Sequence, residues 1–279
     1  MKVPELPEVE TIRVELLPWI IGQHFTQVTL LDRKLLRWPS PEEFQQLVGQ
    51  RVESLERRGK YLIFHLSSGL SLIMHLRMTG AVLLNPGSIG HYARAVFHLS
   101  NDARLVFSDR RRLGTIWLGG DAGAIIGKLG PEPLAEDFTP EVLSKLLGEH
   151  HIPIKAALID QNIIAGIGNM YADEILFAAR IHPLRRTDTL SDEEIQSLYN
   201  SIRVVLASAI GNKGASVDTY VRPGGQLGRA QFDFKVAHRK GQTCPVCHAP
   251  IQRIPVRNRG TYFCPNCQHA TTKMLLLSH

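Results

Sequence analysis

The chain has 279 residues, of which 44% are hydrophobic and 21% are charged, a composition that excludes intrinsic disorder and allows two folded domains. Lysine and arginine together number 32 against 26 acidic residues, and the resulting net charge of +6 favours an acidic partner such as nucleic acid. There is no apolar run of about 18 residues and no signal-peptide pattern, so we expect a cytoplasmic protein without a membrane span.

The first predicted element is a helix that begins at Leu6-Pro7-Glu8. Proline suits a first helical turn, and glutamates there complement the positive end of the helix dipole. Apolar residues then recur at helical spacing, at Val9, Ile12, Leu16 and Ile20. We therefore expect this helix to be pinned to a core.

Short runs with strand character follow from residue 25 to about 118, separated by turn residues. This pattern predicts an antiparallel sandwich or barrel. Residues 130–141, GPEPLAEDFTPE, are rich in proline and acidic residues and indicate an inter-domain linker. Mostly helical patterns come next, and a glycine-rich stretch leads into a small cysteine module. The predicted boundaries are 1–130 for the sandwich, 131–139 for the linker, 140–228 for the helical domain and 229–279 for the cysteine module with its tail.

The four cysteines form two CxxC pairs, Cys244 with Cys247 and Cys264 with Cys267, which sixteen residues separate. This spacing fits four thiolates around one tetrahedral zinc ion. A redox pair or fortuitous cysteines are the alternatives, but matched pairs that use every cysteine of a cytoplasmic chain favour zinc. With all four positions filled by protein ligands, we expect one structural Zn²⁺.

Three other motifs are weak when each is taken alone. The GIGN turn before a helix offers amides and Asn169 to a phosphate, or is a plain helix connection. Lys155 upstream supplies a matching charge, or is a solvated lysine. The arginines of DRRRLG at 109–114 are typical of a solvated turn, but arginine beside an apolar side chain also suits the filling of a base stack after a base leaves it. Arg259 belongs to a basic hairpin between the cysteine pairs. This hairpin is either a nucleic-acid contact or a basic surface without a partner.

Several motifs match one family in order and spacing: PELPEVET at 4–11, ERRGKYL at 56–62, HLRMTG at 75–80, DRRRLG, GPEPL at 130–134, GIGN and the cysteine pairs. The chain closely resembles the bacterial formamidopyrimidine-DNA glycosylases, the Fpg or MutM branch of the Fpg/Nei family, from residue 4 to about 268. The resemblance implies an α+β fold with an N-terminal antiparallel β-sandwich and flanking helices, a C-terminal helix-two-turn-helix domain and a four-cysteine zinc finger. It further implies a monomer that clamps damaged double-stranded DNA in the cleft between the two domains.

The activity that the resemblance implies is that of a bifunctional DNA glycosylase and AP lyase of base excision repair. Such an enzyme removes oxidised purines, chiefly 8-oxoguanine and formamidopyrimidines, and cuts the strand by β,δ-elimination. Pro4 corresponds to the nucleophile, since a free secondary amine that attacks C1′ gives a cationic iminium. Glu5 corresponds to the proton-transfer group for the sugar ring oxygen, Lys60 to the general acid of β-elimination, and Arg259 to the group credited with δ-elimination. Without the rest of the pattern, Glu5 would be a helix-start acid and Lys60 a strand-flanking cation.

The implied DNA contacts are a wedge of Met78, Arg111 and Leu113, and the phosphate ligands Lys155 and Asn169. Leucine replaces the usual phenylalanine at 113, and Asp-Arg-Arg replaces the usual Asp-Pro-Arg at 109–111. The smaller leucine side chain cannot stack on a base, so we expect it to probe base pairs less firmly. Tyr92-Ala93-Arg94 stands where relatives have a histidine pair, so Tyr92 corresponds to a DNA contact by position only. His150-His151 stands where relatives often carry lysines.

Two alternatives stay open at this point. The sibling Nei branch removes oxidised pyrimidines, but KGASVDTYVRPGGQ at 213–226 resembles the loop that closes over 8-oxoguanine, which favours purine lesions. The second alternative is a lesion-binding protein without catalysis, and it depends on the N-terminus.

In MKVPELPEVE as written, Pro4 is internal, and a tertiary amide nitrogen cannot act as a nucleophile. Val3 occupies the position of the relatives' initiator methionine, and the valine codon GTG is also a bacterial start codon. Our hypothesis is that translation begins at residue 3 with methionine, whose removal exposes Pro4.

Overall fold

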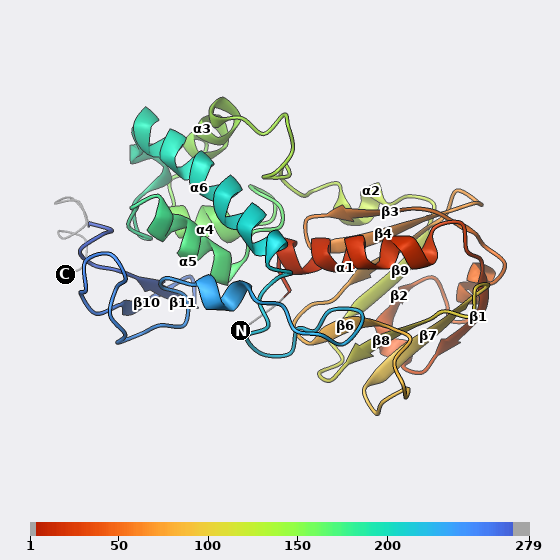
Figure 1. The fold of residues 1–279 in the computed structure, drawn as a ribbon. Helices are drawn as coiled ribbons and strands as arrows, with labels where there is room; N and C mark the ends of the chain where they lie inside the picture. The colour runs from red at the N-terminus through yellow and green to blue at the C-terminus, as the bar shows by residue number, and fades with distance from the viewer. Residues whose placement is uncertain (1–3, 270–279) are drawn as a thin grey trace. The chain divides into compact units, whose positions relative to one another are not determined.

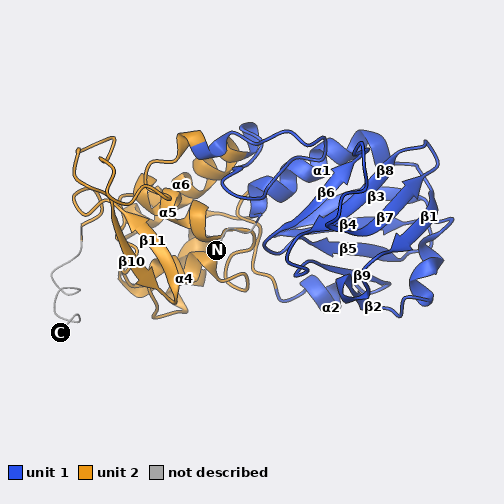
Figure 2. Cartoon of the chain, turned by 90° about the horizontal axis from the view of Figure 1, so that it is seen from below, with its two compact units in different colours: residues 1–128, 210–231 blue, residues 129–209, 232–279 orange. Residues whose placement is uncertain are grey.

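The computed structural model describes residues 4–269, which form two compact units (Figure 2). Unit 1 contains the described residues up to Lys128 together with Ile210–Gln231. Unit 2 contains Leu129–Ala209 together with the described residues from Phe232 onward. Packing thus joins 210–231 to the N-terminal part of the chain, whereas the boundaries predicted above follow chain order and stay predictions.

Two sheets form unit 1 (Figure 1). The four-stranded sheet has the order β1-β7-β8-β6, with β1 (Phe25–Leu30), β6 (Gly80–Leu84), β7 (Ala93–Leu99) and β8 (Arg104–Asp109). The five-stranded sheet has the order β2-β9-β5-β4-β3, with β2 (Leu36–Trp38), β3 (Val52–Arg58), β4 (Tyr61–Leu66), β5 (Ser71–His75) and β9 (Thr115–Gly119). Neighbouring strands are antiparallel except β2 and β9, which are parallel. The predicted antiparallel architecture is confirmed.

One hydrophobic cluster lies between these sheets and takes side chains from both, among them Phe97 of β7 and Phe64 of β4. Helix α1 (Leu6–Ile20) completes this cluster, because Val9, Ile12, Leu16 and Ile20 are all buried in it, as their spacing predicts. Every residue of β5, which lies between β9 and β4 within its sheet, is buried. Unit 1 also contains the short helices η1 (Arg33–Leu35), η2 (Glu43–Leu47) and α2 (Gly123–Ile126).

Unit 2 is built from helices and one hairpin. Its elements are α3 (Pro140–Gly148), α4 (Ile154–Ile159), α5 (Asn169–Ala178), η3 (Thr187–Thr189), most of α6 (Asp192–Gly211), β10 (Gln252–Val256) and β11 (Arg259–Phe263); η4 (Ala230–Asp233) spans both units. Helix α5 is buried along most of its length, and Tyr171 packs edge to face on Phe234 at 5.9 Å between ring centroids. Among the residues described, no helix is long and apolar enough to cross a bilayer.

Candidate active site and zinc centre

The sequence Pro4-Glu5 leads directly into α1, and both side chains are buried. Glu8 in the first turn of α1 is fully buried, and its Oε2 accepts a 2.7 Å hydrogen bond from the Glu5 N–H. The other oxygen, Oε1, accepts a 2.7 Å bond from the N–H of Ala215. Glu8 therefore links the start of α1 to the 213–226 segment.

Glu8 has a role that sequence reasoning missed, because there it counted only as an acid that suits a helix start. The signal was present in the spacing: a glutamate three residues after the residue that precedes a helix is the pattern of a capping box. The pattern does not reveal the second bond, since Ala215 is 207 residues away in the chain.

Lys60 and His75 lie near one another at one end of the five-stranded sheet. Lys60 is half-buried in the turn between β3 and β4, and His75 is the buried last residue of β5. Nδ1 of His75 accepts a 2.9 Å bond from the Arg77 N–H, so the ring proton sits on Nε2. Burial, together with the charges of Arg77 and Lys60, lowers the pKa of His75 to about 3. A neutral histidine thus lies beside the predicted catalytic lysine, and the sequence analysis did not select it.

The predicted wedge residues come from two loops that the sheet holds side by side. The register of β6 and β8 pairs Gly80 with Asp109, which places the Met78 loop next to the 109–114 loop. A guanidinium nitrogen of Arg111 lies 3.4 Å from the Met78 sulfur, and Leu113 on the same loop is 38% exposed. The structure therefore brings these three residues together.

The neighbouring Arg112 has a different position from Arg111. Its guanidinium forms two hydrogen bonds with the buried carboxylate of Asp32 and thereby holds the pKa of that carboxyl below its usual value. Arg111 and Arg112 are both exposed, but the pair with Asp32 makes Arg112 an anchor of the loop. Tyr92, the remaining predicted DNA contact of unit 1, is 45% exposed, and its carbonyl accepts a 2.8 Å bond from the Asp109 N–H.

The 213–226 segment is fastened to unit 1 at several points. Tyr220 is buried in the main core cluster, and its hydroxyl donates to the Lys213 carbonyl at 3.2 Å. Thr219 donates to the carbonyl of Met78 at 3.4 Å. Two guanidinium nitrogens of Arg222 bond to Oε1 of Glu15 in α1, at 2.7 and 2.6 Å. The segment that resembles a lesion-closing loop is therefore packed against α1 and the Met78 loop.

Lys155, Asn169 and Arg259 all belong to unit 2 and lie around the start of β11. Nζ of Lys155 bonds to Asp173 Oδ1 at 2.6 Å, and both side chains are fully buried or nearly so. The Gly260 carbonyl, next to Arg259, accepts from Lys155 at 3.4 Å and from Asn169 at 3.0 Å. The structure brings the three residues together, and their contact with DNA phosphates stays a prediction.

Asp173 is a second buried acid that sequence reasoning missed. Burial raises its pKa to about 7, against the opposing influence of Lys155. Its position one helical turn after Asn169 in α5 was the available signal, but burial cannot be read from that spacing.

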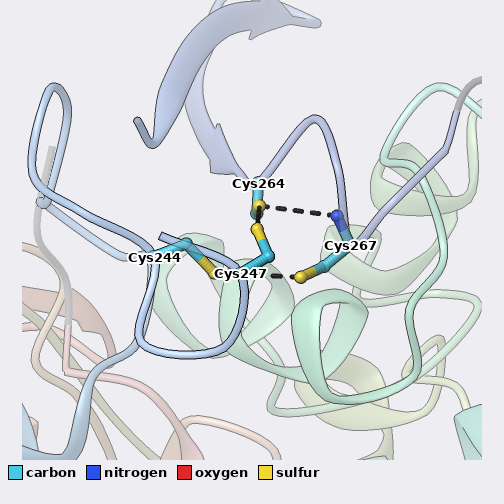
Figure 3. Close-up of side chains that lie close together, drawn as sticks. All are labelled: Cys244, Cys247, Cys264 and Cys267. Carbon is cyan, nitrogen blue, oxygen red and sulfur yellow. Dashed lines mark hydrogen bonds between the residues drawn. The ribbon is translucent and has the colours of Figure 1, made fainter. Parts of the chain in front are cut away.

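The four cysteine side chains converge at the base of the β10–β11 hairpin (Figure 3). Their sulfur atoms all lie within 4.8 Å of one another, with 3.8 Å between Cys244 and Cys267 and 3.3 Å between Cys247 and Cys264. A tetrahedron of sulfurs at the usual Zn–S distance of about 2.3 Å has edges of about 3.8 Å, so the cluster fits a zinc ion. The predicted structural zinc site is confirmed by this arrangement and by the zinc-finger match described next.

Three domain families match the chain in order. The formamidopyrimidine-DNA glycosylase N-terminal domain covers residues 3–116, the formamidopyrimidine-DNA glycosylase H2TH domain covers 129–221, and the zinc finger found in FPG and IleRS covers 241–270.

Relatives and solved structures agree over nearly the full length. The formamidopyrimidine-DNA glycosylase of Chloroflexus aurantiacus is 44% identical over 271 residues, which cover 95% of this chain and 98% of that protein. The structure of MutM (Fpg) from Thermus thermophilus has a TM-score of 0.86 and 40% identity, and the match covers 95% of this chain and 98% of that one. The complex of Lactococcus lactis Fpg with a Fapy-dG containing DNA has a TM-score of 0.87 at 35% identity, with 95% and 100% coverage. The resemblance seen in the motifs is confirmed, and the chain belongs to the formamidopyrimidine-DNA glycosylase family.

Proposed function

We propose that this protein is a bifunctional DNA glycosylase and AP lyase that removes oxidised purines, 8-oxoguanine and formamidopyrimidines, from double-stranded DNA. Family membership supports a DNA glycosylase, and the Lactococcus lactis relative is seen with a Fapy-dG containing DNA. One observation in this chain carries the finer proposal. The buried Glu8 carboxylate bonds both to Glu5, beside the candidate nucleophile, and to Ala215, in the segment that resembles a purine-closing loop.

The chemistry begins with Pro4, whose free secondary amine would attack C1′ of the damaged nucleotide. The N–C1′ bond forms as the glycosidic bond breaks, and the base leaves with a proton. The sugar ring then opens: the C1′–O4′ bond breaks, O4′ takes up a proton, and C1′ and the proline nitrogen form the iminium. This cation withdraws electrons from the sugar, which permits loss of the 3′ and then the 5′ phosphate. An N-terminal amine is less basic than a lysine by roughly 2 to 3 pKa units, so more of it is unprotonated at neutral pH.

The other roles follow from position. Glu5 adjoins Pro4 and would deliver the proton that the sugar ring oxygen takes up when the ring opens, and Lys60 would act as general acid in β-elimination. Arg259 would assist δ-elimination, and Lys155 and Asn169 would bind phosphates from unit 2. Met78, Arg111 and Leu113 would fill the space that the everted base leaves, with Tyr92 beside them. We propose a cytoplasmic monomer.

This proposal requires a chain that begins at Pro4. Residues 1–3, on which the start-site hypothesis depends, lie outside the described residues. Intact-mass measurement on protein from the native host will give the true N-terminus. Borohydride will then trap the iminium on an 8-oxoguanine duplex, and peptide mapping should find the adduct on Pro4. A Glu5→Gln variant serves as the matched control, with the amine intact and the proposed proton transfer impaired.

The alternatives give different results in the same assay. A native chain that retains Met1 and yields no adduct contradicts the proposal and favours a lesion-binding protein. An adduct that forms on a thymine-glycol duplex and not on 8-oxoguanine would assign the protein to oxidised pyrimidines.

A further inference from the structure

We propose that Asp109 is the positioning residue that fixes the DNA wedge of unit 1, the side chains of Met78, Arg111 and Leu113, in one arrangement. The inference rests on the proposed function, because a wedge has a task only in a protein that everts a base. Asp109 itself would not touch DNA, since its side chain is fully buried at the end of β8.

The carboxylate of Asp109 organises the 110–114 loop from inside. Oδ2 accepts hydrogen bonds from the N–H groups of Leu113 at 2.7 Å and Gly114 at 2.6 Å. Oδ1 accepts a 3.1 Å bond from the N–H of Arg111. Two of the three wedge residues therefore have their backbone bonded to this one side chain.

The third wedge residue is reached through Thr79. The Thr79 hydroxyl donates to Asp109 Oδ1, and the same oxygen of Thr79 accepts a 3.1 Å bond from the Arg111 N–H. Thr79 directly follows Met78 in the chain. The hydroxyl thus closes a small ring of bonds between the Met78 loop and the Arg111 loop, and the ring fixes how far apart the two wedge side chains stand.

The backbone of Asp109 extends the same arrangement to Tyr92. Its N–H donates to the Tyr92 carbonyl at 2.8 Å, and its carbonyl accepts from Nε of Arg94 at 2.9 Å. Asp109 thus bonds directly to three of the four predicted DNA contacts of unit 1, and it bonds to Thr79, the neighbour of the fourth, Met78.

Two further features show that the loop is built around this carboxylate. A Cβ on Gly114 would lie 2.7 Å from the Phe107 ring and 3.1 Å from Asp109 Oδ2, so only glycine allows the chain this close. Arg112 has a φ of 57°, a conformation that costs free energy and persists only where surrounding bonds enforce it. Asp109 supplies those bonds on the inner side of the loop, and Asp32 holds the Arg112 guanidinium on the outer side.

A wedge must resist the stacked bases that it separates, so a loosened loop would lose base eversion before it lost chemistry. Removing one acceptor would also leave N–H groups of the loop unpaired, among them the buried one of Gly114. Asp109→Asn keeps the shape of the side chain. Where its NH₂ replaces Oδ2, this group faces the N–H donors of Leu113 and Gly114 and cannot accept their hydrogen bonds. Thr79→Val removes only the hydroxyl that joins Asp109 to the Arg111 N–H, and Thr79→Ser keeps that hydroxyl.

Three measurements on the full-length protein distinguish a loss of wedge insertion from a loss of chemistry. Excision of 8-oxoguanine from a duplex reports the whole reaction. Fluorescence of 2-aminopurine in a duplex with a tetrahydrofuran abasic analogue reports wedge insertion without chemistry. Cleavage of an abasic site in single-stranded DNA requires chemistry without a wedge. We expect Asp109→Asn and Thr79→Val to lower excision and the fluorescence rise by about tenfold or more, with single-stranded cleavage within about twofold of wild type. Thr79→Ser should match wild type.

The proposal is overturned if both variants give the wild-type fluorescence rise, or if all three readouts fall in equal proportion, as for a plain loss of folded protein. Should Asp109→Asn fail to fold, the comparison of Thr79→Val with Thr79→Ser decides by the same criteria. Failure of the proposed function looks different: wild type would not excise 8-oxoguanine, yet the fluorescence rise on the tetrahydrofuran duplex would still distinguish Thr79→Val from Thr79→Ser.

Discussion

His75 is a neutral imidazole close to two cations, and this has a consequence for stability at low pH. Its pKa is about 3 in the folded protein against an ordinary value of 6.5. Below pH 6.5 the unfolded chain therefore binds a proton at His75 that the folded protein does not bind. The free energy of unfolding consequently falls as the pH falls from about 6.5 toward 3, by at most about 1.4 kcal/mol per pH unit. His75→Gln keeps an acceptor for the Arg77 N–H and removes the titration. Between pH 7.5 and pH 5 in urea, wild type should lose about 2 kcal/mol more than this variant.

The control for that experiment is His91→Gln, which removes an exposed imidazole. It should keep the pH dependence of wild type. Parallel curves for wild type and His75→Gln would contradict the assignment of the acid sensitivity to His75.

The pair of Lys155 and Asp173 makes a second prediction at the scale of single residues. Both side chains are buried, with exposures of 0% and 1%, so neither charge has water to compensate for a lost partner. Asp173→Asn or Lys155→Met should each lower the free energy of unfolding of unit 2 by about 3 kcal/mol or more. The double variant Lys155→Met/Asp173→Leu removes both charges and should recover most of that loss in urea denaturation. A double variant as unstable as the sum of the single variants would show that the pair is not the cause.

Among the elements, the 213–226 segment depends on a contact that its own sequence does not reveal. The Arg222–Glu15 pair is partly buried, with exposures of 26% and 19%, and fastens the segment to α1. Arg222→Gln should speed hydrogen exchange over residues 217–226 by about fivefold, corresponding to about 1 kcal/mol for one such pair. The exchanged pair Glu15→Arg/Arg222→Glu should restore protection. Arg229→Gln removes the same charge from an exposed position nearby and should change nothing; equal effects of both variants would point to net charge.

Elements with strong local patterns could be predicted from the sequence, and their pairing could not. The stripe of Val9, Ile12, Leu16 and Ile20 fixes both the helical nature of α1 and its buried face. The order β1-β7-β8-β6 includes a pairing of strands about 70 residues apart, β1 with β7, in which Phe25 meets Leu99, and no local pattern encodes that pairing. The parallel pairing of β2 with β9 could likewise not be predicted from the sequence.

The candidate site divides in the same way. Motifs identified the four cysteines, because residue type and spacing carry that chemistry, and they selected exposed side chains, such as Arg111, whose contact with DNA stays a prediction. They did not identify Glu8, His75, Asp109 or Asp173, whose importance comes from burial and from partners elsewhere in the chain. Nor could they distinguish Arg111 from Arg112, since only the fold places Asp32 beside one of them.

For the whole molecule, the zinc site should control unit 2 and not unit 1. The hairpin between the cysteine pairs provides the Gly260 carbonyl that Lys155 and Asn169 share, and the buried Gln268 side chain bonds both the Cys264 N–H and the Ile181 carbonyl. Loss of the metal would therefore release groups buried beneath α5, whereas the sheets of unit 1 have a core of their own.

Chelation of zinc, or Cys267→Ser, should accordingly speed hydrogen exchange in α5 by about tenfold or more while exchange in β4 and β5 stays unchanged. Affinity for duplex DNA should fall as well, since Arg259 and its neighbours lose their support. Val246→Ala alters a 58% exposed residue between the first two cysteines and controls for a substitution in the module. Unchanged exchange in α5 after verified loss of zinc would mean that helical packing alone holds unit 2 together. Faster exchange in both units would mean that the two cores do not unfold independently.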